Sequence, residues 1–152
     1  MRYIPLPALV LGALGLLPFA LGALLTLLPP ATIWTFGLTN SQPAGGVLLL
    51  ARYGTIILCF MAGALWGFAA AGNRRPGWLE LIVAVLPALW LVFSLAHVTI
   101  QDALWALALG FIALIPADMV FQRGGLAPSW WMALRIPLTI VVVACLAIGA
   151  LA

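Results

Sequence analysis

The chain has 152 residues, of which 66% are hydrophobic and only 6% are charged. A soluble globular domain is about 45–50% apolar and about 25% charged, so these few charges cannot cover a water-soluble fold. The mean hydropathy of +1.28 therefore indicates an integral membrane protein. All the basic residues are arginines, and they are scattered along the chain. Nucleic-acid binding needs a dense basic patch or stripe, so composition excludes that class as well.

Five apolar stretches are long enough to cross a bilayer, which takes about 20 residues for each helix. The first stretch carries Pro18 near its middle, where the missing backbone donor predicts a kink. An uncharged connection follows over residues 29–46, and we expect it to lie on the membrane surface. The sequence predicts an all-α integral membrane protein, a five-transmembrane-helix bundle in which residues 1–152 form a single membrane domain. The predicted spans cover about residues 4–28, 47–71, 78–98, 101–120 and 130–152.

Three of these spans carry local signals. The second contains Gly63 and Gly67 in a GxxxG pattern, which permits a tight helix crossing. The fourth begins at Asp102, where a negative charge favours the N-terminus of a helix. The fifth opens with Trp130 and Trp131, aromatic residues that suit the membrane interface.

The distribution of arginines predicts the orientation in the membrane. With five spans, the N-terminus and the second-to-third and fourth-to-fifth connections share one face, and the opposite face holds only Arg52. Arginine-rich short connections stay cytoplasmic, so we expect a cytoplasmic N-terminus and a periplasmic C-terminus. Glu80 is expected to neutralise Arg74 or Arg75. The arginines on the cytoplasmic face are Arg2, Arg74, Arg75, Arg123 and Arg135.

Ionisable residues inside the spans are costly and are candidates for function. Arg52 and Asp102 lie at similar depth near the outer face, while Asp118 and Arg135 lie near the inner face. The helix dipole opposes a carboxylate near a helix C-terminus, so Asp118 is predicted to have a cationic partner. We therefore predict two structural pairs, Arg52 with Asp102 and Asp118 with Arg135. The alternative is that these charges line an ion or anion path.

Other chemistry-bearing residues are few. His97, at the outer end of the third span, could ligate haem or relay a proton. There is no second histidine to complete a bis-imidazole site, which favours an interfacial hydrogen-bonding role. Cys59 and Cys145 fall short of a zinc site and are predicted to be small buried hydrophobic residues. No catalytic spacing is present, so we predict no catalytic, cofactor or metal site.

Three motifs resemble one known family, the transmembrane protein 69-like family of domains of unknown function. Its members are small five-helix proteins of bacterial inner membranes, with a mitochondrial relative. The similarity covers most of the chain and implies the fold and the membrane, while the family has no assigned activity. The family pattern often has His before Trp-Gly. This chain has Leu65 at that position, so a ligand or proton role is not carried over to it. The motifs are Gly15-Leu16-Leu17-Pro18-Phe19, Arg52-Tyr53-Gly54 through Trp66-Gly67, and Trp131 through Leu134-Arg135 to Leu138-Thr139.

These observations predict a non-enzymatic accessory, assembly or scaffold protein of the bacterial inner (cytoplasmic) membrane. By analogy with the mitochondrial relative, its setting would be a respiratory or other energy-converting complex. The expected partners are the lipid bilayer and another membrane protein, with no cofactor and no nucleic acid. The alternative is a small membrane carrier or channel that uses Arg52, Asp118 and Arg135.

Overall fold

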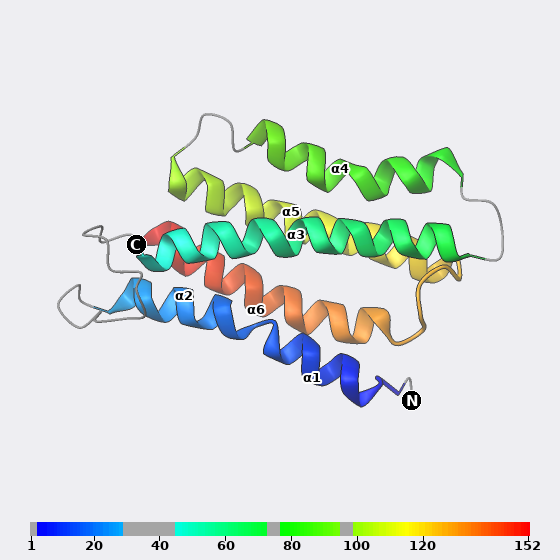
Figure 1. The fold of residues 1–152 in the computed structure, drawn as a ribbon, viewed down its shortest axis with the longest axis horizontal. Helices are drawn as coiled ribbons and strands as arrows, with labels where there is room; N and C mark the ends of the chain where they lie inside the picture. The colour runs from blue at the N-terminus through cyan, green and yellow to red at the C-terminus, as the bar shows by residue number, and fades with distance from the viewer. Residues whose placement is uncertain (1–2, 29–44, 73–76, 95–98) are drawn as a thin grey trace.

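The computed structural model describes residues 3–28, 45–72, 77–94 and 99–152. Within these ranges all regular secondary structure is α-helical, as predicted. Figure 1 shows the helices side by side along one long axis, with the start of α1 and the end of α6 at opposite ends. The helices are α1 (Leu6–Leu14), α2 (Leu17–Leu27), α3 (Gly45–Ala71), α4 (Trp78–Ser94), α5 (Ile100–Arg123) and α6 (Trp131–Leu151).

Four helical segments are long and apolar enough to cross a membrane. They are α1 and α2 taken together, with 22 residues, and α3, α5 and α6, with 27, 24 and 21 residues. The apolar helix α4 is shorter, with 17 residues, which is the lower limit of the usual range of about 17–25. These helices coincide with the predicted spans. The surface connection predicted for residues 29–46 lies mostly outside the described residues.

The predicted kink separates α1 from α2. The helix breaks at Gly15 and Leu16 and resumes with Pro18 in the first turn of α2, where a missing N–H costs nothing. The break leaves carbonyl groups without helical donors, and the hydroxyl of Tyr53 in α3 donates to the Gly15 carbonyl at 3.1 Å. The kink is therefore tied to α3 by a side-chain hydrogen bond, which matters in an environment without water.

Helix α2 packs closely on α3 because glycines meet at the crossing. A Cβ atom on Gly22 would lie 2.8 Å from Cγ of Leu50 and 3.3 Å from the carbonyl oxygen of Gly46. By contrast, a Cβ on Gly63 or Gly67 would meet no atom within 4 Å. Within the described chain, no neighbouring helix makes the tight crossing that this GxxxG pattern permits.

The core lies where α2, α3, α5 and α6 meet. The ring of Phe19 packs edge-on against Tyr53, at 5.0 Å between centroids, and against Phe111, at 6.1 Å. The peripheral helices contribute little, since α1 buries no residue and α4 buries only Ala84 and Leu91. The fully buried leucines around these rings are Leu50, Leu58, Leu65, Leu104, Leu107, Leu114 and Leu146.

The cysteines divide between two environments. Cys145 is buried, as predicted, whereas Cys59 is exposed on α3, so the prediction of a buried side chain is wrong for Cys59. Lipid tails are as apolar as the protein core, and a small apolar side chain gains little by facing one rather than the other. Hydrophobicity alone therefore does not say which cysteine faces inward.

We expect Gly22→Ala to lower the thermal stability of the detergent-solubilised protein, because the new methyl group cannot fit between Leu50 and Gly46. Overpacking of this kind costs about 1–3 kcal/mol. The matched control is Gly63→Ala on α3, where the methyl group meets open space and no loss is expected. Equal melting temperatures for the two variants would contradict the close α2–α3 contact.

Candidate functional site

A buried ion pair joins α5 to α6 and is the centre of the candidate site. The Nε atom of Arg135 donates to Oδ2 of Asp118 at 2.9 Å. Asp118 is 2% exposed and Arg135 is 6% exposed. The structure therefore brings together the two residues that their depth in the sequence had paired.

A second donor from α6 forms a hydrogen bond with the other oxygen of the Asp118 carboxylate. The indole Nε1 of Trp131 donates to Oδ1 of Asp118 at 2.7 Å. Trp131 and Arg135 are four residues apart and share one helix face, so one face of α6 supplies both donors. The Trp131 ring also packs edge-on against Phe68 of α3, at 4.9 Å and 88°. From the sequence, Trp131 is expected only at the membrane interface, although its i, i+4 spacing to Arg135 is a signal that indicates this role.

The guanidinium of Arg135 has one contact with an aromatic ring and one unsatisfied group. Its Cζ lies 6.0 Å from the ring centroid of Phe111, within the range of a cation–π attraction. Among the described residues its Nη2 has no hydrogen-bond partner, and neither has Oγ1 of Thr139. The pair as a whole is neutral, because one carboxylate offsets one guanidinium. What remains at this centre is two buried polar groups without partners among the described residues, Nη2 of Arg135 and Oγ1 of Thr139, rather than a net charge.

The turn between α5 and α6 sets the register of the pair. The side-chain Nε2 of Gln122 donates to the carbonyls of Pro128 and Ser129 at 3.1 and 2.6 Å. Gly125 has a φ of 72°, a left-handed conformation that side chains other than glycine rarely adopt. The turn thus reverses the chain tightly and places the start of α6 beside the end of α5.

The second predicted pair does not form. Arg52 is exposed on α3, and the carboxylate of Asp102 instead accepts a hydrogen bond from Thr99 Oγ1 at 2.7 Å. Thr99 Oγ1 in turn accepts from the backbone N–H of Asp102 at 3.2 Å, capping the N-terminus of α5. The predicted Arg52–Asp102 pair is therefore wrong. Similar depth along two helices does not make their side chains face one another, because each helix can also rotate about its axis.

The remaining sequence candidates contribute no assembled site. Glu80 Oε2 accepts a hydrogen bond from the backbone N–H of Gly77 at 2.6 Å at the start of α4. Its predicted partners Arg74 and Arg75, and also His97, lie outside the described residues. In the described ranges no group of three or more His, Cys, Asp or Glu residues could hold a metal ion.

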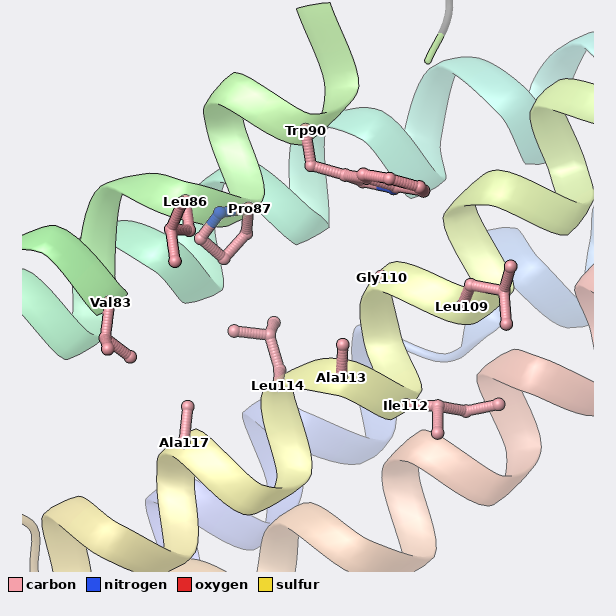
Figure 2. A pocket seen from close by; sticks show the side chains of 10 residues that line it. All are labelled: Val83, Leu86, Pro87, Trp90, Leu109, Gly110, Ile112, Ala113, Leu114 and Ala117. Carbon is pink, nitrogen blue, oxygen red and sulfur yellow. The ribbon is translucent and has the colours of Figure 1, made fainter. Parts of the chain in front are cut away.

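An apolar groove of about 530 Å³ runs between α4 and α5. Figure 2 shows the α4 side chains Val83, Leu86, Pro87 and Trp90 opposite the side chains of α5. None of the residues that line this groove is charged, and the indole N–H of Trp90 is already donated to the carbonyl of Ala106 at 3.3 Å. The groove therefore offers van der Waals contact and no site for an ion.

Replacing either member of the buried pair should cost more than replacing both. Asp118→Ala strands a guanidinium and Arg135→Ala strands a carboxylate, and breaking a buried pair in this way costs about 3–5 kcal/mol. The double variant leaves no unpaired charge, so we expect it to melt above both single variants in detergent. Arg123→Ala, an exposed arginine at the same end of α5, is the control and should have little effect. Strictly additive losses would contradict the pair.

Comparison with known proteins confirms the resemblance drawn from the motifs. Residues 4–151 match the family described as protein of unknown function, DUF3429. The chain is also 33% identical over 149 residues to transmembrane protein 69 of Xenopus tropicalis, and the match covers 91% of this chain and 51% of that protein. The chain thus spans about half the length of this relative. No solved structure matches it. With a family model that covers nearly all of its residues, this multi-pass helical membrane protein belongs to the DUF3429 family.

Proposed function

We propose that this protein is a non-enzymatic accessory, assembly or scaffold component of an energy-converting membrane. The observation that carries the proposal is the internal neutralisation of Asp118 by Arg135, whose atoms Oδ2 and Nε lie 2.9 Å apart. A carrier or channel needs charges that face a water-filled path and can exchange partners with its substrate. Here both groups are buried and already bound to each other, and Arg52 lies elsewhere on the outside of α3. This arrangement favours a structural bundle over a conduit.

The periphery of the bundle is suited to lateral contacts. Helix α1 buries none of its residues, and α4 exposes large side chains such as Trp78, Leu79 and Phe93. These two helices present apolar surface on opposite sides of the core (Figure 1). In a membrane such surface contacts lipid or other transmembrane helices. An accessory protein that binds its partner laterally would use these surfaces.

The proposal includes five membrane crossings, a cytoplasmic N-terminus and a location in the bacterial inner membrane. Two observations support it. The start of α1 and the end of α6 lie at opposite ends of the bundle (Figure 1), which an odd number of crossings requires. Helix α4, at about 25 Å for its 17 residues, runs beside α3 and α5 and supplies the fifth crossing. Arg123 and Arg135 then share the cytoplasmic end.

Cysteine labelling tests this topology. The native Cys59 and Cys145 are first replaced by alanine, and a single cysteine is then introduced either as Arg75→Cys or in a C-terminal extension. We expect a membrane-impermeant maleimide to label the extension from the periplasmic side and the residue-75 site only after the membrane is opened. The cysteine-free protein is the control. Labelling of both sites from the same side would contradict five crossings.

Purification in a mild detergent, followed by reconstitution, tests the function. We expect another membrane protein to co-purify in a fixed ratio, and proteoliposomes of the isolated protein to show no ion or anion flux above empty vesicles. The matched control is the Asp118→Ala and Arg135→Ala double variant. Flux that the double variant loses would instead support a carrier that uses these charges. A haem absorption band would contradict the cofactor-free proposal and assign a role to His97.

A further inference from the structure

A polar hollow of about 300 Å³ lies where α5 ends and α6 begins. It is lined by Met119, Gln122 and Arg123 of α5 and by Met132 and Ile136 of α6. The side-chain amide of Gln122 is bound to carbonyls of the α5–α6 turn, whereas the side chain of Arg123 is exposed. The hollow therefore presents an accessible arginine at the end of the bundle.

The charge of Arg123 is not neutralised within the described part of the chain. The acidic residues are Glu80, Asp102 and Asp118, all of them described, and none forms an ion pair with Arg123. Asp118 is paired with Arg135, and Asp102 lies in the first turn at the opposite end of α5. An arginine stays charged at any physiological pH. Arg123 is therefore available to an anion from outside the chain.

An apolar hollow of about 630 Å³ adjoins the polar one along the line of contact between α5 and α6. Ile136 lines both hollows. On α6 the lining continues from Met132 through Ile136 and Ile140 to Ala147, and such spacings keep residues on one face of a helix. Ile112, Ile136 and Ile140 are exposed, so the apolar hollow is open at the side of the bundle. We refer to the two hollows together as the α5–α6 groove.

The length of the α5–α6 groove matches one lipid molecule. From Met132 to Ala147 it extends about 22 Å along α6. Half of a bilayer, headgroups included, is about 20–22 Å thick. Arg123 is the last residue of α5, and the neighbouring Trp130 and Trp131 suit the headgroup layer. The polar part of the groove thus lies at the level of the headgroups and the apolar part at the level of the acyl chains.

The apolar part of the groove is narrower than a helix. Its 630 Å³ extend from Ile136 to Ala147, which is about 16 Å at the rise of an α-helix. The mean cross-section is therefore about 40 Å², or about 7 Å in width, whereas a helix with its side chains is about 10–12 Å across. An extended acyl chain fits this space, and a transmembrane helix does not.

Arg123 determines which headgroup fits best. The planar fork of a guanidinium matches the oxygens of a phosphate group. A zwitterionic headgroup brings its own ammonium group, which offsets the charge of its phosphate, so an anionic lipid is attracted more strongly to an arginine without a counter-ion. The helix dipoles do not oppose this binding, because the C-terminal end of α5 disfavours an anion and the N-terminal end of α6 beside it favours one.

We propose that the α5–α6 groove binds one anionic phospholipid, with its phosphate at Arg123 and an acyl chain in the apolar part of the groove. The guanidinium binds the headgroup, and Ile136 and Ile140 contact the chain. A free phosphate ion would lack the contacts of the chain, so the ligand is the lipid. This site does not depend on the protein partner proposed above.

Native mass spectrometry of the delipidated full chain in detergent tests the headgroup preference. The protein is titrated with dioleoylphosphatidylglycerol, which is anionic, or with dioleoylphosphatidylcholine, which has the same acyl chains and is zwitterionic. We expect the anionic lipid to bind about fivefold more tightly. Arg123→Gln should abolish this preference. Arg52→Gln, which replaces an exposed arginine of α3 outside the groove, is the matched control and should retain it.

Filling the apolar part of the groove tests the position of the chain. Ala144 is exposed and lines the groove, so Ala144→Phe should weaken the binding of both lipids severalfold through lost van der Waals contact. Ala70→Phe, at an exposed alanine of α3 outside the groove, should bind both lipids as the wild type does. Melting temperatures without lipid show whether each variant is folded.

Several results would overturn the proposal. Equal affinity of the wild-type protein for the two lipids would show that Arg123 does not select the headgroup, and this comparison needs no variant to fold. Equal loss of the preference in Arg123→Gln and Arg52→Gln would assign it to the overall charge. Equal binding by Ala144→Phe and Ala70→Phe would place the lipid elsewhere. Displacement of the anionic lipid by inorganic phosphate would assign Arg123 to a free anion, and a dimer that Ala144→Phe dissociates would assign the groove to a second copy of the chain.

Discussion

The Asp118 carboxylate is the group on which the arrangement of α5 and α6 depends. An ionised carboxylate at 2% exposure near the C-terminal end of a helix is disfavoured both by its apolar surroundings and by the helix dipole. Both of its oxygens are satisfied by donors from one face of α6, Arg135 and Trp131. Helix α6 can therefore be neither rotated nor shifted by a turn without stranding a charge. The α5–α6 turn, in which Gly125 has a left-handed conformation, must therefore place α6 in this register relative to α5.

Helices α2 and α3 are connected to this pair through aromatic rings. Trp131 packs on Phe68 of α3, and Arg135 lies over Phe111, whose ring meets Phe19 of α2. Phe19 in turn contacts Tyr53, which donates a hydrogen bond to the Gly15 carbonyl at the kink. The three motifs that resemble the family thus meet in one continuous set of contacts. A membrane bundle gains little from hydrophobic burial between helices, so polar contacts and ring packing of this kind carry much of its specificity.

Internal satisfaction of the charges also shapes what the protein can do. Asp118 and Arg135 neutralise each other inside the bundle, and the groove between α4 and α5 is lined by residues that carry no charge. The groove between α1, α3 and α6 includes Arg135 in its lining, but the Nη2 atom of that residue is buried and has no hydrogen-bond partner among the described residues.

The sequence by itself determined the class of protein, the extent of the helices, the kink at Pro18 and the pairing of Asp118 with Arg135. Each follows from quantities that are local along the chain, namely hydropathy over about 20 residues, a missing backbone donor, and a short turn that forces neighbouring helices together. Only the tertiary structure decided that Arg52 and Asp102 do not meet and that Trp131 is the second donor to Asp118. It also decided that, among the described residues, no atom lies within 4 Å of where a Cβ atom on Gly63 or Gly67 would be. All three depend on the rotation of each helix about its axis. In a soluble protein the apolar stripe of a helix determines that rotation. In a bilayer, apolar side chains are equally stable facing lipid or facing the core. Close packing and the few polar groups therefore have to set the rotation of each helix.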